Sequence, residues 1–150
     1  MFSEVLVICV GNICRSPMAE TLLRHRLPDA GVLVHSAGIG ALPGAPMDPR
    51  AEAVLNALQI TTLPHIARQV DRQMLRQAEL ILLMEQAHQS NILRLAPEVR
   101  GKTFLIGKWQ QELEIADPYR GPKSAFEQTF EALSLCVDDW LPYLHSGETR

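Results

Sequence analysis

The feature that most constrains the fold is a short apolar run near the start of the chain, Val5 to Cys9. The run is rich in β-branched residues and is apolar at every position rather than at alternate ones. Such a run is typical of a strand buried on both faces of a parallel sheet. It ends at Gly11 and Asn12, which permit a tight turn. Ser16-Pro17 then predicts a helix start with the serine hydroxyl as N-cap, so the chain opens with strand, loop and helix.

Strands and helices alternate along the rest of the chain. This alternation predicts right-handed βαβ units and a doubly wound α/β fold, in which a four-stranded parallel sheet lies between helices on both faces. Ligands of such folds bind at the carboxyl ends of the strands. No linker or internal repeat interrupts the pattern, so residues 1–150 are expected to form a single domain. The further strands are predicted at 32–36, 80–84 and 103–106, and the helices at about 18–27, from 48, from 71, at 86–96 and from 124.

Three of the predicted helices carry specific expectations. Asp48-Pro49 predicts a capped start, and Asp71 predicts the cap of a short helix. The apolar residues after Asp48 share one helical face, which predicts packing against the sheet. They are Ala51, Val54, Leu55 and Leu58. The clearest amphipathic pattern predicts a long closing helix with Phe126, Phe130, Leu133, Val137, Trp140 and Leu144 on its buried face.

Composition and charge exclude several classes of protein. The chain has 14 Lys+Arg against 17 Asp+Glu, whereas nucleic-acid-binding proteins normally show a basic excess, so no nucleic-acid partner is expected. The apolar runs are far shorter than the roughly 20 residues that span a bilayer, and the N-terminus shows no signal-peptide pattern. We therefore expect a cytoplasmic protein without membrane insertion. No large apolar patch is evident, which favours a monomer.

The three cysteines are Cys9, Cys14 and Cys136. An odd number of thiols in an unsecreted chain argues against a disulfide framework. Cys136 falls beside Leu133 and Val137 on the closing helix and is expected in the core. At least one of the other two thiols is a candidate for reactivity.

The loop after the first strand carries the chemistry. It reads CVGNICRSP over residues 9–17, a cysteine and an arginine separated by five residues and followed by serine. A loop that curls between a strand and a helix N-terminus directs backbone N–H groups inward, where they form a nest for a tetrahedral anion. Arg15 can grip two oxygens of that anion in a fork. The predicted phosphate-binding residues are Val10, Gly11, Asn12, Ile13, Cys14 and Ser16.

Cys9 is the candidate nucleophile. Amide dipoles, a helix N-terminus and a guanidinium all favour a thiolate over a thiol at this point, and the Ser16 hydroxyl can donate to the sulfur. The alternative is that Cys9 only packs the end of a buried strand. A phosphate ester also needs a proton for its departing oxygen, and Asp117, in the segment Asp117-Pro118-Tyr119, is the candidate acid. The alternative for that segment is a plain turn.

Several further motifs accompany the loop and the Asp-Pro-Tyr segment. They are HSAG at 35–38, HIARQ at 65–69, LME at 83–85 and IGKW at 106–109. In this order and spacing the chain resembles the low-molecular-weight protein tyrosine phosphatases over nearly its whole length. Within that family it is most similar to bacterial enzymes that act on tyrosine autokinases controlling capsule or exopolysaccharide export. The resemblance implies a phosphotyrosine protein as partner, specifically the cytoplasmic domain of such a membrane kinase.

The resemblance also implies roles for individual residues. Cys9 becomes the nucleophile of a phosphocysteine mechanism, Arg15 the phosphate clamp and Asp117 the general acid. Asn12, Ser16 and Ser36 match positions that keep the loop in shape. His65 matches a buried histidine that supports Asn12, with Glu20 as a possible partner. Tyr119 and Leu42 would line the entrance. Many family members carry an aromatic residue near the position of Leu42.

No metal or cofactor is expected, because no cluster of histidine, cysteine or carboxylate residues has metal-ligand spacing. The loop amides and Arg15 would stabilise the charged oxygens instead. Cys14 leaves two alternatives open. It can trap an oxidised Cys9 as a disulfide, or it can simply fill the back wall of the loop.

Four other functions are alternatives to the tyrosine phosphatase. A thioredoxin-coupled arsenate reductase of this fold needs two further cysteines in the middle of the chain, and none lies between Cys14 and Cys136. A phosphoarginine phosphatase typically carries threonine at the position of Ile13. A non-catalytic phosphate-binding module needs neither Cys9 nor Asp117, and a nucleotide-binding protein of flavodoxin type would show a different glycine-rich loop.

Overall fold

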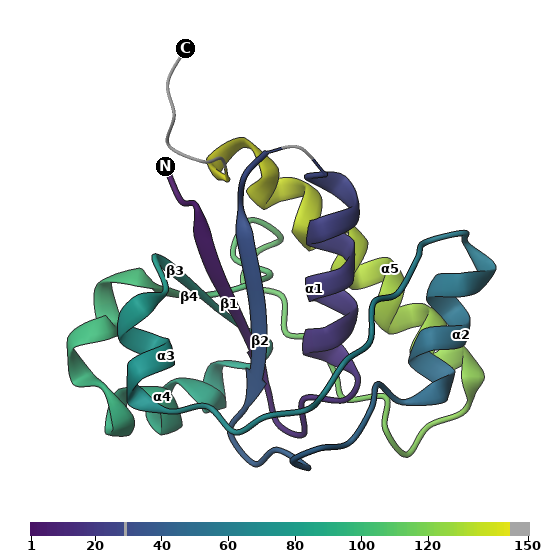
Figure 1. The fold of residues 1–150 in the computed structure, drawn as a ribbon, viewed down its shortest axis with the longest axis horizontal. Helices are drawn as coiled ribbons and strands as arrows, with labels where there is room; N and C mark the ends of the chain where they lie inside the picture. Colours follow the sequence, from purple (N-terminus) through teal and green to yellow (C-terminus); the bar gives the residue numbers. More distant parts are fainter. Residues whose placement is uncertain (29, 145–150) are drawn as a thin grey trace.

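The computed structural model describes residues 1–28 and 30–144. Its centre is a four-stranded sheet in the order β2-β1-β3-β4, in which all neighbouring strands are parallel (Figure 1). The strands are β1 (Glu4–Cys9), β2 (Leu33–Gly38), β3 (Leu80–Leu83) and β4 (Thr103–Leu105). The predicted doubly wound α/β fold is confirmed, and β1 lies in the middle of the sheet.

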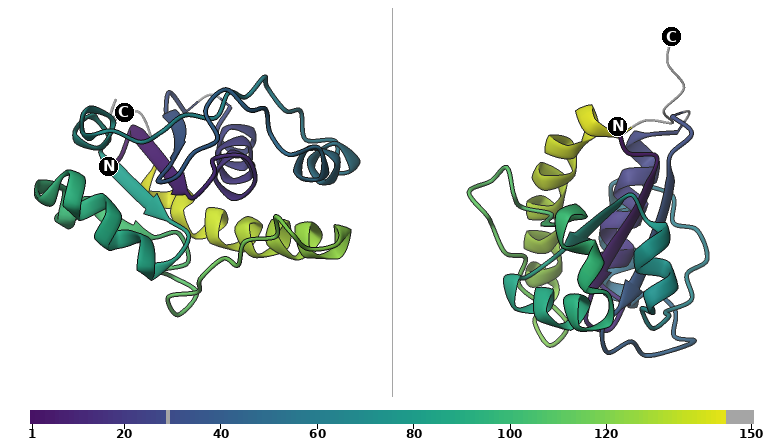
Figure 2. Two further views of the ribbon diagram at one scale, coloured as in Figure 1. Left: turned by 90° about the horizontal axis from the view of Figure 1, so that it is seen from below. Right: turned by 90° about the vertical axis from the view of Figure 1, so that its left-hand side faces the viewer.

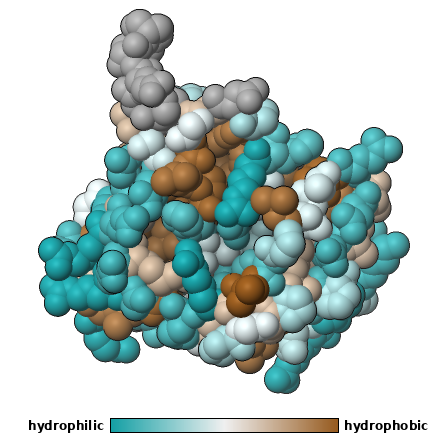
Figure 3. Space-filling model, viewed as in Figure 1, coloured by the Kyte–Doolittle hydropathy of each residue, from teal (hydrophilic) through white to brown (hydrophobic). Residues whose placement is uncertain are grey.

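Helices lie on both sides of the sheet (Figure 2). They are α1 (Arg15–Arg26), α2 (Pro49–Ala57), α3 (Arg72–Gln77), α4 (Gln89–Leu95) and α5 (Lys123–Trp140), with 3-10 helices at Gln86–His88, Pro97–Lys102 and Leu141–Tyr143. No helix in the described ranges is long and apolar enough to cross a membrane. On the face drawn in Figure 3, hydrophilic side chains separate the apolar surface into patches.

The apolar character of β1 on both faces has a direct cause. Val5, Val7 and Cys9 point into the core formed with α1 and α5, and Leu6 and Ile8 point into the core formed with α3 and α4. None of the five is more than 3% exposed. Because side chains alternate along a strand, a central parallel strand needs apolar residues at every position. Cys9 thus ends β1 on the α1 side of the sheet.

Two predicted helix caps are confirmed and one is wrong. The Asp48 side chain accepts a hydrogen bond from the Arg50 N–H at 2.8 Å, and that of Asp71 accepts one from the Met74 N–H at 2.8 Å. Ser16, however, lies inside the first turn of α1, which begins at Arg15, and Cys14 is the N-cap residue. The Ser16 hydroxyl is engaged by other side chains of the loop and so is not a cap.

The predicted packing of the second helix is also wrong. α2 packs chiefly on α1 and α5, not on the sheet, because the long connection after β2 carries it past α1 to the edge of the molecule (Figure 1). Ala51, Val54 and Leu55 are buried in that contact, whereas Leu58 follows the end of the helix and is 53% exposed.

Two other helix boundaries differ from the prediction. The segment predicted as one helix at 86–96 divides into a 3-10 turn and α4. The closing helix ends at Trp140, since Pro142 lacks the N–H that an α-helix interior requires, and the buried Leu144 lies beyond it. Cys136 is fully buried in the core, as predicted.

Gly38, the last residue of β2, offers a test of how tightly the sheet supports the loop after β1. A Cβ atom at Gly38 would lie 2.2 Å from the Val10 carbonyl oxygen, whereas one at Gly101 would meet nothing within 4 Å. We expect Gly38→Ala to lower the free energy of unfolding by about 1–3 kcal/mol, because the loop backbone must shift. Gly101→Ala is the control and should change it by about 0.5 kcal/mol or less. Urea denaturation of both variants measures this, and equal stabilities would contradict the tight approach.

Candidate active site

The loop between β1 and α1 is shaped by bonds to its carbonyl oxygens. Four of these oxygens accept hydrogen bonds from backbone N–H groups in the segment 39–48. The pairs, acceptor first, are Cys9 with Ile39 at 3.0 Å, Val10 with Gly40 at 3.0 Å, Gly11 with Leu42 at 3.1 Å and Ile13 with Asp48 at 2.8 Å. Within residues 1–28 and 30–144, the N–H groups of residues 11–15 have no main-chain acceptor. With the carbonyls turned outward, these amides form a nest for an anion.

Asn12 is the centre of the loop's side-chain network. It is fully buried and has a φ of 60°, the left-handed conformation that asparagine tolerates. Its Nδ2 donates to Ser16 Oγ at 2.8 Å and to Ser36 Oγ at 3.0 Å, while its Oδ1 accepts from the Arg68 N–H at 2.9 Å. His65 Nε2 donates to the Asn12 carbonyl oxygen at 2.6 Å. The network fixes the turn from four sides.

The predicted pairing of Glu20 with His65 is wrong. Glu20 Oε1 accepts from Ser36 Oγ at 2.6 Å, and Glu20 Oε2 lies 2.5 Å from Arg24 one helical turn later. One carboxylate oxygen therefore binds Ser36 of β2 and the other binds Arg24 of α1, and neither binds His65. His65 is only half-buried, and it supports Asn12 through the backbone carbonyl.

Cys9 lies at the floor of the site. Its Sγ is 2.9 Å from Ser16 Oγ, and the residue is 3% exposed. Cys14 is also buried, and both residues are free thiols. Burial, followed by the charges of Asp48 and Asp117, raises the pKa of Cys14 to about 12, so this side chain stays a thiol.

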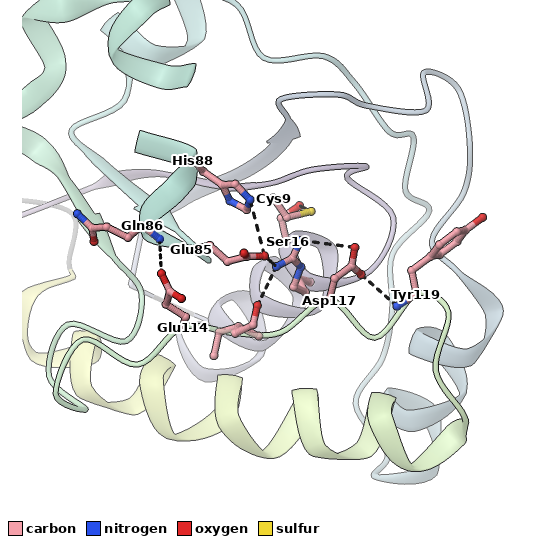
Figure 4. A network of polar contacts seen from close by, with 10 residues as sticks. Cys9, Ser16, Glu85, Gln86, His88, Glu114, Asp117 and Tyr119 are labelled. Atoms are coloured by element: carbon pink, nitrogen blue, oxygen red, sulfur yellow. Dashed lines mark hydrogen bonds and ion pairs between the residues drawn. The ribbon is translucent and has the colours of Figure 1, made fainter. Parts of the chain in front are cut away.

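Arg15 is 2% exposed and its guanidinium is anchored at one end. Nη1 donates to Glu85 Oε2 at 2.5 Å and to the Ile115 carbonyl at 2.8 Å, and Nη2 lies 3.7 Å from Asp117 Oδ2. Figure 4 shows Glu85 and Asp117 gathered with Cys9 at this point. Glu85 lies two residues after the end of β3, so neighbouring strand ends deliver both the nucleophile candidate and the carboxylate that orients Arg15.

Sequence reasoning missed Glu85 and Ile115 as parts of the site. Glu85 stood within the LME motif at the carboxyl end of a predicted strand, and that position was a usable signal. Ile115 acts through its backbone carbonyl, which leaves no trace in residue type.

His88 is a buried histidine behind Glu85. Its Nε2 lies 3.7 Å from Glu85 Oε2, and its Nδ1 has no hydrogen-bond partner among the described residues (Figure 4). Burial lowers the pKa of His88, the nearby Arg15 lowers it further, and Glu85 opposes the shift. The imidazole is therefore neutral at neutral pH.

Asp117 lies at the mouth of the site, with its side chain 48% exposed. Its Oδ1 accepts from the Tyr119 N–H at 3.0 Å, so the Asp-Pro-Tyr segment is a turn as well as a wall of the site. Tyr119 and Leu42 are both partly exposed at the rim. Arg120 is exposed on the same segment, and Lys123 is exposed at the start of α5.

These residues enclose one cleft of about 190 Å³. It is lined by Cys9, Val10, Gly11, Ile13, Cys14, Arg15, Gly40, Leu42, Asp117 and Tyr119. A larger cavity of about 380 Å³ lies behind the loop, beside Glu20, Ser36 and His65, and none of its lining residues is a cysteine. Two loop residues, Asn12 and Ser16, do not line the smaller cleft. Ser36 and His65 also lie outside it, and both contact Asn12. Among residues 1–28 and 30–144, no group of three or more His, Cys, Asp or Glu side chains is arranged to hold a metal ion.

The lowered pKa of His88 generates a prediction for stability against pH. The unfolded chain binds a proton more readily than the folded protein does, so stability falls as the pH falls below about 6.5. His88→Gln removes this group, and its free energy of unfolding should therefore decline less between pH 7 and pH 5. Urea denaturation at pH 7, 6 and 5 measures the slope, with His25→Gln as an exposed control on α1. Equal slopes for wild type and His88→Gln would contradict the prediction.

The chain is similar to several known proteins. Residues 4–148 match the family model described as low molecular weight phosphotyrosine protein phosphatase. The chain is 43% identical over 150 residues to the low molecular weight protein-tyrosine-phosphatase Wzb of Salmonella typhimurium, with 100% of this chain and 99% of that protein covered. A structure of Vibrio vulnificus Wzb in complex with benzylphosphonate matches with a TM-score of 0.91 and 38% identity, over 96% of this chain and 100% of that one.

A further similar structure is the YwlE arginine phosphatase from Geobacillus stearothermophilus. It matches with a TM-score of 0.85 and 29% identity, over 97% of this chain and 99% of that one. The family resemblance predicted from the motifs is confirmed, since the matched span holds the loop of residues 9–17 and the Asp117 segment together with the sheet between them. The chain belongs to the low molecular weight phosphotyrosine protein phosphatase family.

Proposed function

We propose that the chain hydrolyses phosphotyrosine in proteins through a phosphocysteine intermediate. One observation carries the proposal. Cys9, Arg15 and Asp117 line a single narrow cleft, with the thiol buried at its floor and the carboxyl group exposed at its mouth. A phosphoryl group on the loop amides would have a nucleophile on one side and an acid on the other.

In the first step, the Cys9 thiolate attacks phosphorus and forms a sulfur–phosphorus bond. The bond from phosphorus to the tyrosine oxygen breaks, and Asp117 in its acid form gives its proton to that oxygen. The loop amides and the Nη2 side of Arg15 stabilise the three equatorial oxygens. Glu85 and the Ile115 carbonyl keep the other side of the guanidinium in place.

In the second step, water attacks phosphorus and Asp117 accepts its proton. The sulfur–phosphorus bond breaks, inorganic phosphate forms, and Cys9 leaves as a thiolate. Ser16 Oγ, 2.9 Å from the sulfur, is placed to donate to that thiolate. Both proton transfers use one carboxyl group, so the cycle returns the enzyme to its starting state.

The lining of the cleft supports an aromatic substrate. Val10, Ile13, Leu42 and Tyr119 give it apolar walls, and a phenyl ring is flat enough to enter between them. Leu42 has no ring to stack on the substrate, so Tyr119 is the aromatic residue of the cleft that can do so. The apolar Ile13 favours an aryl phosphate over a phosphorylated guanidinium, which would leave polar N–H groups against a hydrocarbon side chain.

We further propose that the partner is the cytoplasmic domain of a membrane tyrosine autokinase that controls capsule or exopolysaccharide production. The resemblance to bacterial phosphatases of such systems supports this assignment. The phosphatase would then act in the cytoplasm, with residues 1–150 as one catalytic domain. A Cys9→Ser variant that retains phosphotyrosine proteins from cell extracts, identified by mass spectrometry, tests the partner.

The proposed roles predict distinct losses of activity. With p-nitrophenyl phosphate, reductant and no added metal, Cys9→Ser should lose roughly 10⁴-fold or more of kcat, because the nucleophile is gone. Asp117→Asn should lose roughly 10²- to 10⁴-fold, because the proton donor is gone. Asp138→Asn, an exposed carboxyl change on α5, serves as the control and should leave kcat unchanged. Reduced wild-type protein without turnover, or an active Cys9→Ser variant, would overturn the proposal.

Substrate choice gives a second prediction. We expect kcat/KM for a phosphotyrosine peptide to exceed that for a phosphoarginine peptide of the same sequence by roughly 10- to 200-fold, the discrimination that pocket shape and polarity supply. Ile13→Thr should reduce the ratio by placing a hydroxyl in the cleft wall. Steady-state phosphate release from both peptides measures it. Equal or better turnover of phosphoarginine by wild type would favour the arginine phosphatase alternative.

A further inference from the structure

The segment that carries Asp117 needs an anchor. Residues 114–122 form neither helix nor strand, and the Asp117 side chain at their centre is 48% exposed. At the start of the segment, the Ile115 N–H donates to the Met84 carbonyl at 2.9 Å and the Ile115 carbonyl accepts from Arg15 at 2.8 Å. These bonds fix the side of the segment before Asp117, and the side after it requires a separate attachment.

Arg50, near the start of α2, supplies that attachment. Its Nη2 donates to the Tyr119 carbonyl at 2.7 Å and its Nη1 donates to the Gly121 carbonyl at 3.3 Å. The guanidinium carbon also lies 4.5 Å from the centroid of the Phe126 ring and 5.9 Å from that of Tyr119. One side chain thus joins the tip of the Asp117 segment to α5 through hydrogen bonds and cation–π contacts.

Arg50 is also connected to the loop of residues 9–17, here called the phosphate loop. Asp48 Oδ2 accepts from Arg50 Nη2 at 3.0 Å, Asp48 Oδ1 accepts from Arg50 Nε at 3.2 Å, and the Asp48 side chain is 6% exposed. The Asp48 N–H in turn donates to the Ile13 carbonyl at 2.8 Å. A continuous series of bonds therefore runs from the phosphate loop through Asp48 and Arg50 to the segment of Asp117.

We propose that Arg50 is a positioning residue that keeps Asp117 over the thiol of Cys9. This role for Arg50 rests on the proposed function, because Arg50 would act through Asp117 as the general acid. The series of bonds sets the Asp117 segment relative to the phosphate loop, and a shift of about 1 Å in a catalytic group is enough to lower a rate markedly. Arg50 itself does not line the cleft.

A leaving-group comparison separates positioning from general stabilisation. Phenol, like tyrosine, leaves as a strong base and needs the proton of Asp117, whereas 2,4-dinitrophenol is acidic enough to leave without it. Loss of Arg50 should therefore lower kcat/KM for phenyl phosphate and largely spare that for 2,4-dinitrophenyl phosphate. A merely structural residue would lower both alike.

The experiment compares Arg50→Gln, Arg50→Lys and Arg72→Gln on both substrates. We expect Arg50→Gln to lose roughly 10-fold or more on phenyl phosphate and less than about 3-fold on the dinitrophenyl ester. Arg50→Lys should recover part of the loss, because lysine keeps the charge but not the fork. Arg72→Gln removes an arginine that pairs with Glu98 on the far side of the sheet, and it should match wild type on both substrates.

A double variant completes the test. If Arg50 acts through Asp117, Arg50→Gln should cost almost nothing on phenyl phosphate in the Asp117→Asn background. Equal losses on both substrates, or full additivity in the double variant, would overturn the role of Arg50. The proposed function would still stand, because wild-type protein would be active in the same assays. Inactive wild-type protein would instead overturn the proposed function. Thermal unfolding checks each variant, and Arg50→Lys carries the same comparison if Arg50→Gln does not fold.

Discussion

The outward hydrogen bonds of the phosphate-loop carbonyls are the constraint on which the site depends. Backbone N–H groups of the segment 39–48 donate hydrogen bonds to four of these carbonyls, and His65 Nε2 donates one to the carbonyl of Asn12. Only with the carbonyls engaged outside can the amides converge on one point inside. The left-handed Asn12, fixed by its side-chain bonds, makes this arrangement sterically possible. Loss of these bonds would disperse the positive ends of the amide dipoles that an anion and a thiolate both need.

The parallel sheet then gathers charge from distant parts of the chain. β1 ends at Cys9, β3 is followed by Glu85, and the segment after β4 brings Ile115 and Asp117. A buried arginine is costly unless its donors are satisfied. Glu85 and the Ile115 carbonyl satisfy Nη1 of Arg15 and leave the rest of the guanidinium toward the cleft. The same geometry that stabilises a buried charge therefore aims it at a phosphoryl group.

Local signals in the sequence were sufficient for much of the fold and for the position of the Cys9–Arg15 loop after the first strand. The apolar run of β1, the caps at Asp48 and Asp71, and the CVGNICRSP loop depend on neighbouring residues, and these features are present as predicted. Two errors are local, the Ser16 cap and the division of the helix predicted at 86–96. The others concern contacts between segments far apart in sequence. Arg15 meets Ile115 across 100 positions, and Arg50 meets Tyr119 across 69. The packing of α2 on α1 and α5 and the partners of Glu20 also depend on tertiary arrangement, which residue type and spacing do not encode.

A covalent intermediate on Cys9 is the step that joins the loop, the arginine and the acid into one mechanism. The most direct measurement quenches the enzyme in acid during turnover of p-nitrophenyl phosphate and locates the phosphoryl group by mass spectrometry of peptides. The mechanism predicts a phosphorylated Cys9 peptide that appears within the first turnover and is absent from Cys9→Ser. Turnover without a phosphorylated Cys9 peptide, or with phosphate on another residue, would contradict it.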